Sequence, residues 1–293
     1  MKTYTITETM TPEDWQPLLE DIRVIQLELA NELKRICDKH EINYFMIAGT
    51  TLGAIRHQGF IPWDDDMDFG MLRKDYIKFI DIAKYELDNK YFLQTWHTDP
   101  NFGVPFAKIQ YKNSKLIESN QPEHLQDNSG VFIDIFPYDF IAKDKAIRKN
   151  IWNLYQYISR LLLLKNNYKL NANSFPKKLA LYVLQLIANF NSRDKLIKHL
   201  EAIETECNKQ HQQSGIVITL GGWYGYEKEV MELDWCVNLE DRSFEEYQYP
   251  CQVNYDAYLE HLYGDYMKWP DEDKRYNQHG LVKVVINEGV DQV

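Results

Sequence analysis

One acidic segment, residues 59–69 with the sequence GFIPWDDDMDF, constrains the fold more than any other part of the chain. It places four carboxylates within five positions: Asp64, Asp65, Asp66 and Asp68. These charges repel one another, so a fold keeps them where a cation neutralises them or where all of them face water. Apolar residues interleave with the acids and give the segment a buried side: Ile61, Trp63, Met67 and Phe69.

The spacing of Asp66 and Asp68 indicates a site for a divalent cation. If residues 66–69 are extended, both side chains point to the same face, because side-chain direction alternates along a strand. Two carboxylates on one face suit Mg²⁺, which commonly binds one or two carboxylates plus substrate phosphates; Mn²⁺ is the alternative ion. A solvated acidic loop is a second interpretation. A calcium loop is disfavoured, because its sixth position is Phe69 where the turn needs Gly.

A third carboxylate, Asp134, is the one charge inside the apolar segment 131–137, VFIDIFP. A buried, unpaired carboxylate is costly, so Asp134 needs a partner. A metal ion shared with Asp66 and Asp68 would supply one. A structural salt bridge with an Arg or a Lys is the alternative.

Composition places the chain among ordinary globular proteins. Its 293 residues, 44% hydrophobic and 26% charged, are enough for one large domain or two small ones. The net charge of −11 disfavours sequence-independent nucleic-acid binding and electrostatic attachment to anionic lipid. We expect no secretory signal and no membrane span, and the four scattered cysteines indicate free thiols in a reducing cytoplasm.

Hydrophobic periodicity predicts a mixed fold, α+β or α/β, with strands and helices in the front half and helices after it. Helices are expected at 12–40 (N-capped by Thr11), 51–57, 73–87, 143–165, 176–211 and 255–262, and strands at 44–48, 67–71, 91–96, 104–111 and 131–136. The tail after Gly215 is otherwise expected to be irregular. We therefore divide the chain into a catalytic core with the N-terminal helix, a helical insert or subdomain, and a C-terminal segment that contributes to the substrate site: residues 1–142, 143–212 and 213–293.

Three segments form a recognisable set: AGTTLGAIRHQGFIPWDDDMD (48–68), VFIDIFPY (131–138) and LYGDYM (262–267). Together they resemble the LicD family, phosphotransferases of bacterial cell-surface glycans that are distantly similar to animal fukutin-type transferases. The resemblance implies a nucleotidyltransferase-like mixed sheet, in which a Gly-Ser or Gly-Thr turn precedes an Asp-x-Asp pair and a later strand supplies a third acid. Here Gly49 and Thr50 match the turn, Asp66 and Asp68 match the pair, and Asp134 matches the third acid.

The resemblance also implies a CDP-activated donor, which is CDP-choline in the best-known branch of the family. A sugar hydroxyl of a teichoic acid, lipopolysaccharide or capsule precursor would attack the distal phosphorus in line and release CMP. Asp66 and Asp68, with Asp134, would hold Mg²⁺ against the diphosphate. Asp134 either completes the metal site or acts as the base toward the acceptor. Asp64 either orients the metal ligands or is the base.

Other residues are candidates for substrate contacts. Arg56 and Lys108 would neutralise the leaving phosphate; a surface ion pair for Arg56 and a strand lysine with an exposed tip for Lys108 are the alternatives. His279 would touch the donor or the acceptor. A quaternary ammonium binds to aromatic faces, and the tail supplies seven aromatic residues for such contacts: Trp223, Tyr224, Tyr226, Trp235, Tyr263, Tyr266 and Trp269.

Three other functions stay open. CDP-ribitol or CDP-glycerol could replace CDP-choline, a nucleotidyltransferase proper would move NMP to a small molecule with the same acids, and a catalytically silent glycan-binding protein could keep the fold. We expect a cytoplasmic enzyme that acts before glycan export, with a peripheral contact to the inner face of the membrane as an option.

Overall fold

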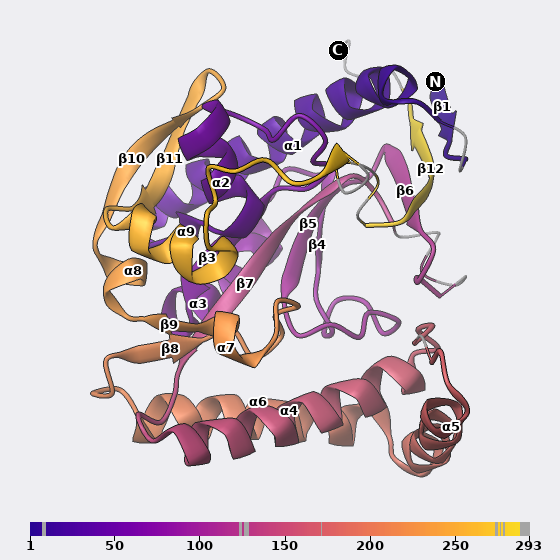
Figure 1. The fold of residues 1–293 in the computed structure, drawn as a ribbon, viewed down its shortest axis with the longest axis vertical. Helices are drawn as coiled ribbons and strands as arrows, with labels where there is room; N and C mark the ends of the chain where they lie inside the picture. The colour runs from indigo at the N-terminus through magenta and orange to yellow at the C-terminus, as the bar shows by residue number, and fades with distance from the viewer. Residues whose placement is uncertain are drawn as a thin grey trace.

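A computed structural model describes residues 1–7, 10–122, 125, 129–170, 172–272, 275, 277 and 279–287. Its centre is a mixed β-sheet with the strand order β2-β3-β7-β5-β4 (Figure 1). Strands β3 and β7 are parallel, and the other neighbours along this path are antiparallel. Two short strands, β8 and β9, continue from the end of β7. The strands are β2 (Phe45–Met46), β3 (Asp68–Leu72), β4 (Tyr91–Gln94), β5 (Ala107–Tyr111), β7 (Phe132–Phe140), β8 (Ile216–Ile218) and β9 (Val230–Glu232).

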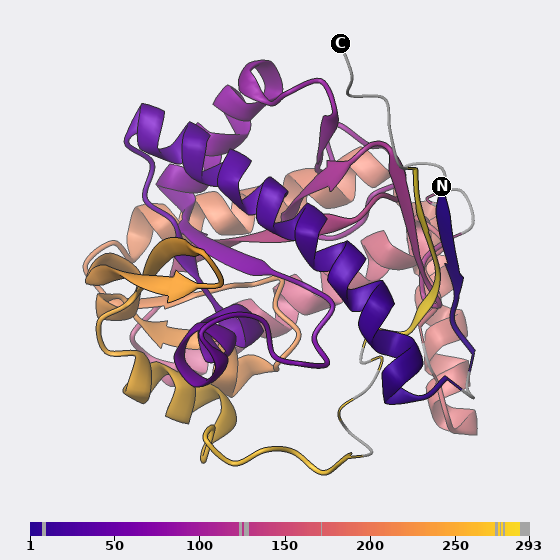
Figure 2. The same cartoon turned by 90° about the horizontal axis from the view of Figure 1, so that it is seen from above.

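Helix α1 (Pro12–His40) lies across one face of this sheet, as Figure 2 shows from above. Thr11 caps the helix: its hydroxyl accepts the Asp14 N–H, and the Asp14 carboxylate accepts the Thr11 N–H. Residues one or two helical turns apart, such as Leu18, Ile22 and Leu29, are fully buried in the core under the helix. The predicted helix at 12–40, its cap and the mixed α+β fold are confirmed.

Strand alternation decides which side chains reach the opposite face. On β7, Ile133 and Ile135 are fully buried in the same core as α1. Asp134, between them, therefore points to the other face, where it lines a cavity. Its neighbours across the sheet are Asp68 on β3 and Lys108 on β5. The fold thus brings three charged side chains from three adjacent strands into one row.

A second sheet joins the two ends of the described chain. Strand β12 (Leu281–Ile286) pairs antiparallel with β1 (Lys2–Thr5) on one side and with β6 (Ser114–Glu118) on the other. Figure 1 shows this small sheet beside the N-terminal end of α1. Because His279 lies just before β12, this pairing brings a residue from near the end of the sequence to the central sheet.

Three helices form a layer below the central sheet in Figure 1: α4 (Lys145–Lys165), α5 (Phe175–Phe190) and α6 (Arg193–Gln210). The segment predicted to be helical at 176–211 is two helices, which separate at Asn191 and Ser192. Ser192 begins the second of them by accepting the Lys195 N–H with its hydroxyl.

A buried ionic network connects this helical layer to the sheet. Arg73, the first residue of α3 (Arg73–Glu86), donates two hydrogen bonds of 2.7 Å to Asp139 at the end of β7. Its guanidinium also lies 3.1 Å from Glu204 of α6, which accepts a hydrogen bond from Tyr155 of α4. The sequence left open whether the helices form a subdomain or pack back onto the sheet, and these contacts pack them onto it.

The segment after Gly215 is more regular than expected. Besides β8, β9 and β12, it forms a hairpin that packs against β2 and donates a hydrogen bond from Gln252 to the Met46 carbonyl. Its remaining elements are α7 (Tyr226–Glu229), α8 (Asp234–Val237), β10 (Leu239–Phe244), β11 (Tyr247–Gln252) and α9 (Tyr255–Tyr263). These strands were not predicted because they are short and because their apolar side chains pack against residues that are distant in the sequence.

The four cysteines are free, as the sequence predicts, and the structure buries all four. Across the ranges of the chain that are described, no helix has both the length and the apolar character needed to cross a membrane.

Candidate functional site

The row of charged residues on the sheet forms the floor of the site. Lys108 contacts Asp134 with its ammonium nitrogen 2.8 Å from Oδ1 and 3.1 Å from Oδ2. The same nitrogen lies 3.2 Å from the centre of the Phe132 ring. The salt bridge that the sequence offered as an alternative for Asp134 is therefore present, and Lys108 is held against the site rather than extended to solvent.

Helix α2 (Ala48–His57) fixes the acidic segment from one side. Gly49 and Thr50 lie in its first turn, so the predicted turn at these residues is wrong and the helix begins three residues earlier than expected. The Thr50 hydroxyl accepts the Asp68 N–H at 2.7 Å, which fixes the start of β3. At Gly49, a Cβ atom would lie 2.8 Å from an Asp64 carboxylate oxygen, so only glycine lets Asp64 approach the helix this closely.

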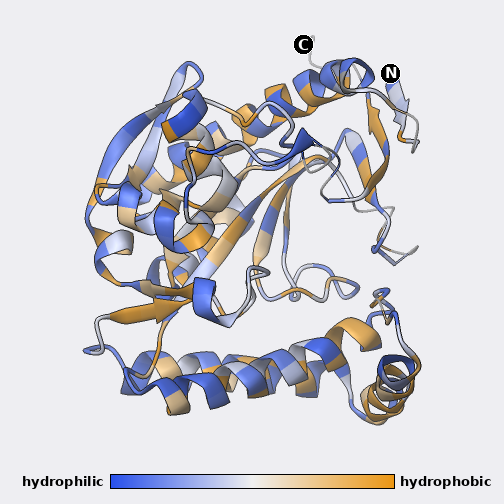
Figure 3. Ribbon diagram, viewed as in Figure 1, coloured by the Kyte–Doolittle hydropathy of each residue, from blue (hydrophilic) through white to orange (hydrophobic). Residues whose placement is uncertain are grey.

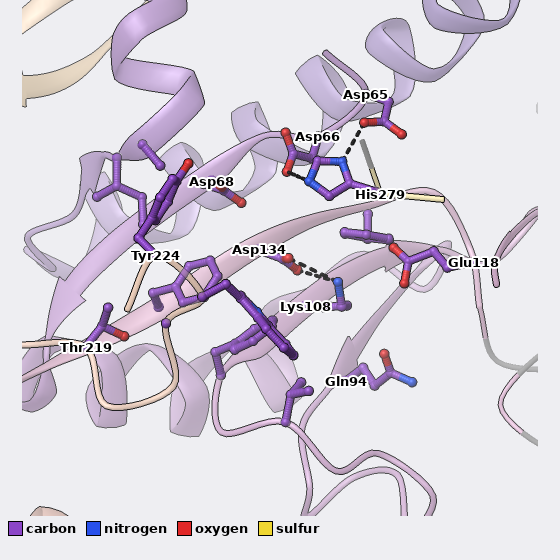
Figure 4. Close-up of a pocket in the computed structure, with 18 of the residues that line it drawn as sticks. Asp65, Asp66, Asp68, Gln94, Lys108, Glu118, Asp134, Thr219, Tyr224 and His279 are labelled. Atoms are coloured by element: carbon purple, nitrogen blue, oxygen red, sulfur yellow. Dashed lines mark hydrogen bonds and ion pairs between the residues drawn. The ribbon is translucent and has the colours of Figure 1, made fainter. Parts of the chain in front are cut away.

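His279 bridges the remaining acids (Figure 4). Its Nδ1 lies 2.6 Å from Asp65 Oδ1, and its Nε2 lies 3.2 Å from Asp66 Oδ2. The negative charge of Asp66, together with Asp65, raises the pKa of His279 to about 11 despite its burial. The imidazole is therefore a cation at neutral pH and offsets part of the acidic charge.

The surroundings of the aspartates favour their protonation or the binding of a cation. Burial raises the pKa of Asp64, Asp66 and Asp68 above the usual range, and the Asp66 charge adds to this effect at both neighbours. Burial also raises the pKa of Asp134, to about 6, while the adjacent Lys108 opposes the rise.

The donor set fits a hard divalent cation. Asp68 Oδ1 is buried and has no hydrogen-bond partner in the described part of the chain, which is the environment a metal ligand would relieve. Among the described residues, the ligand atoms that lie within 4.8 Å of one another belong to Asp65, Asp66 and His279. The predicted set of Asp66, Asp68 and Asp134 is not that tightly grouped, and it stays a prediction.

Two cavities open on either side of these acids. The large cavity, about 490 Å³, is lined by Asp65, Lys108 and Asp134 and by a wall that is mostly aromatic: Phe102, Phe106, Phe132, Phe136, Tyr138 and Trp223. The small cavity, about 440 Å³, is lined by Asp64 and by aromatic and basic residues: Arg56, Trp63, Tyr263, Tyr266, Lys268 and Trp269. Both are lined by Asp66, Asp68, Tyr224 and His279, so the two cavities meet at the Asp-x-Asp pair.

The two predicted phosphate-binding cations lie in different cavities. Lys108 lines the large one and Arg56 the small one. Among the residues that the structure describes, Arg56 forms no ion pair. Its Nη1 donates to the Tyr266 carbonyl at 2.6 Å, which ties the end of α2 to the loop after α9. Five of the seven aromatic candidates line a cavity: Trp223, Tyr224, Tyr263, Tyr266 and Trp269. Tyr226 and Trp235 line neither of these two cavities and pack elsewhere.

The family model for the nucleotidyltransferase domain of LicD, FKTN and FKRP matches residues 41–161. This match contains the whole acidic segment, Asp134 and Lys108. Residues 41–161 belong to the LicD family. His279 and the aromatic residues of the tail lie outside the matched domain, so the chain completes its site with residues from beyond it.

The chain is also similar to individual curated proteins. It is 28% identical over 267 residues to the lipopolysaccharide cholinephosphotransferase LicD of Haemophilus influenzae, covering 89% of this chain and 96% of that protein. Shorter matches are to uncharacterised proteins of Rickettsia typhi, 44% identical over 52 residues, and Rickettsia prowazekii, 44% over 50 residues. These cover 18% and 17% of this chain, and 17% and 19% of the two proteins.

The sequence did not indicate three residues of this site as candidates. Asp65 belongs to the acidic run, so its proximity to His279 could have been suspected. Trp63 lies 5.3 Å from Trp269 between ring centres, with the Arg275 guanidinium near both rings. Glu118, on β6, lines the large cavity with its pKa raised by burial, and no local pattern in the sequence marks it.

Glu229 holds a loop in the wall of the large cavity, and the pH dependence of stability tests this role. Its carboxylate accepts the Tyr224 N–H at 2.7 Å and thereby fixes the loop that carries Trp223 and Tyr224. Burial raises its pKa from 4.5 to about 7. The folded state therefore keeps this proton up to a higher pH than the unfolded state does. The free energy of unfolding consequently falls as the pH rises from about 4.5 to about 7.

We expect Glu229→Gln, which keeps the accepting oxygen, to raise the free energy of unfolding at pH 8 by about 2 kcal/mol. At pH 4.5 the variant and the parent should be equally stable, because both side chains are then neutral. Urea denaturation at both pH values measures the difference, and an equal effect at the two pH values would contradict the assignment.

Proposed function

We propose that this chain transfers phosphocholine from CDP-choline to a sugar hydroxyl of a cell-surface glycan, releasing CMP in a Mg²⁺-dependent reaction. The observation that carries the proposal is the meeting of two cavities at Asp66 and Asp68. An in-line transfer needs the acceptor and the leaving group on opposite sides of the reacting phosphorus. The similarity to the Haemophilus influenzae cholinephosphotransferase over most of both chains supports the choice of donor and acceptor.

The chemistry of the cavity walls supports a place for each half of the donor. The small cavity combines Arg56 and Lys268 with the Trp63–Trp269 pair, which suits the phosphate and flat base of a nucleotide. The large cavity has aromatic faces and buried carboxyl groups, which suit a quaternary ammonium. We therefore place the CMP half in the small cavity, and the choline head group and the acceptor hydroxyl in the large one.

The chain's own groups position the diphosphate between them. Neither Gly49 N–H nor Thr50 N–H, in the first turn of α2, has an acceptor in the described part of the chain, and such groups favour a phosphate. Asp66 and Asp68 would hold the Mg²⁺. When bound, this ion would neutralise charge on the diphosphate. Lys108 holds the Asp134 carboxylate in place through their salt bridge.

This arrangement supports different roles for Asp64 and Asp134. Asp134 lines only the large cavity, and Asp64 lines only the small one. An in-line attack requires the acceptor opposite the departing CMP. Asp134 is then the base that takes the proton of the acceptor hydroxyl, and Asp64 orients groups on the CMP side.

Product analysis tests the reaction. The protein is incubated with Mg²⁺, CDP-choline and a purified lipopolysaccharide or teichoic acid precursor, and CMP and modified glycan are measured together. Equal amounts of CMP and phosphocholine-bearing glycan support the proposal. Transfer only from CDP-ribitol or CDP-glycerol would change the donor, and pyrophosphate release from an NTP would identify a nucleotidyltransferase instead. A thermal-shift screen of the same nucleotides ranks the donors independently, since a bound ligand stabilises the fold.

The two aspartates should respond differently to the acceptor. We expect Asp134→Asn to lower kcat for glycan transfer by about 10²- to 10⁴-fold, while CDP-choline still raises the melting temperature. Asp64→Asn should instead weaken that thermal shift, because Asp64 lies on the nucleotide side. The reverse pattern would exchange their roles without affecting the identity of the donor.

A further inference from the structure

One face of α5 is apolar and open to solvent. Its exposed fractions reach 80% at Phe175, 63% at Tyr182 and 91% at Phe190. The full set is Phe175, Leu179, Tyr182, Val183, Leu186 and Phe190. At 3.6 residues per turn these positions fall within an arc of about 100°, so they form one continuous stripe along the helix. Figure 3 shows this helix largely in orange at a corner of the molecule.

The opposite side of α5 already has a partner within the chain. Leu181, Leu184, Ile187 and Ala188 pack into the core that α4 and α6 share. The exposed stripe is therefore not needed for folding. An apolar face of this extent, kept in water opposite a buried face, is typical of a docking surface.

The chain segment that contains α5 carries a charge opposite to that of the rest of the protein. Residues 145–193 contain nine Lys and Arg and no Asp or Glu. Because the whole chain carries −11, the remaining residues carry −20. The whole-chain charge, which disfavoured attachment to anionic lipid, therefore conceals a basic region with a charge of +9.

Two of these cations are placed where they weaken the helix. Lys177 and Lys178 lie in the first turn of α5, which has no acidic residue. Cations at a helix N-terminus oppose its dipole. At the other end of α5, the Lys165 ammonium donates to the Asn189 carbonyl at 3.3 Å. Basic groups thus flank the apolar stripe at both ends. Lys165 stabilises the C-terminal end of the helix, whereas Lys177 and Lys178 oppose the helix dipole at its N-terminal end.

We propose that α5 docks in the plane of a lipid bilayer with anionic headgroups, with its apolar stripe in the acyl boundary and the flanking lysines among the headgroups. An apolar face bordered by lysines and an aromatic ring at each end is the pattern of an interfacial helix. A symmetric contact with a second copy of this chain would bring two basic regions together, and their repulsion disfavours it. The inference does not depend on the proposed function, because binding to vesicles is measured without turnover.

The position of α5 links this surface to the site. The loop before the helix contributes Tyr168 to the large cavity and donates a hydrogen bond from Lys169 N–H to the Asn120 carbonyl beside it. A bilayer under α5 would therefore lie near the side of the molecule where this loop borders the large cavity.

Co-sedimentation with vesicles tests the proposal. The full chain is mixed with vesicles of phosphatidylcholine alone and of phosphatidylcholine with a quarter phosphatidylglycerol, and the bound fraction is measured against lipid concentration. We expect binding at least tenfold stronger to the anionic vesicles, weakening as salt is raised. Equal partitioning to both vesicle types, or no sedimentation with either, would overturn the proposal.

Matched variants locate the contact. Leu179→Ser with Leu186→Ser should lower binding more than tenfold, whereas Ile77→Ser, on the exposed side of α3 and 52% exposed, should leave it unchanged. Lys178→Ser should lower binding about fivefold, and the exposed Lys74→Ser should not. Circular dichroism checks that each variant is folded. If the leucine variant instead converts a self-associating parent into a monomer without changing vesicle binding, the stripe is an interface between copies and the proposal fails.

Discussion

Replacing Asp68 by Asn is expected to abolish phosphocholine transfer and, at the same time, to stabilise the metal-free protein. Asp68 lines both cavities, and its Oδ1 has no hydrogen-bond partner in the described part of the chain. Loss of a carboxylate at the reacting diphosphate should lower kcat by about 10³-fold or more. Because burial and the charges of Asp66 and Asp134 raise the pKa of Asp68, removing this charge relieves repulsion at pH 8.

The two effects are measured separately. Turnover is followed with CDP-choline and purified acceptor, and the melting temperature is recorded in EDTA and in Mg²⁺. The parent should be stabilised by Mg²⁺, and Asp68→Asn should be more stable in EDTA but respond less to the ion. Asp81→Asn, an exposed carboxylate on α3, is the matched control and should change neither value. Near-normal turnover of Asp68→Asn would refute the metal assignment.

Replacing Arg73 by Met is expected to have the largest effect on stability. Arg73 is paired with Asp139 and Glu204, and both carboxyl groups are buried. Removing the cation leaves two buried carboxylates without a counter-charge, which typically lowers the free energy of unfolding by about 3–5 kcal/mol. Its loss should also weaken the contact between α6 and the end of β7, since this network helps to join them.

The pH dependence gives this prediction a second readout. With Arg73 present, burial still raises the pKa of Glu204 to about 7. Without the cation this carboxyl should hold its proton to still higher pH, so the destabilisation should grow as the pH rises from 5 to 8. Arg35→Met removes an arginine that is about half exposed in a surface pair with Glu32, and should change stability by less than about 1 kcal/mol. A loss for Arg73→Met as small as the control's would show that the network does not hold the layers together.

Much of the core fold was predictable because its signals are local. The cap at Thr11 and the periodic apolar residues after it define α1, and the apolar runs define β3, β4, β5 and β7 to within a few residues. The strands of the tail were not predictable in this way. They are three to six residues long, and the hairpin of β10 and β11 is stabilised by contacts with β2 and α2, about two hundred residues earlier.

The sequence determined which residues could do the chemistry, and the tertiary structure decided how they are grouped. The period of two along a strand was enough to put Asp66 and Asp68 on one side and to mark Asp134 as a charge in need of a partner. Only the pairing of β3, β7 and β5 places Lys108 against Asp134, and only the pairing of β12 with β1 and β6 brings His279 to Asp65 and Asp66. Spacing governs neighbours within one strand, whereas contacts between strands depend on register, which the whole fold fixes.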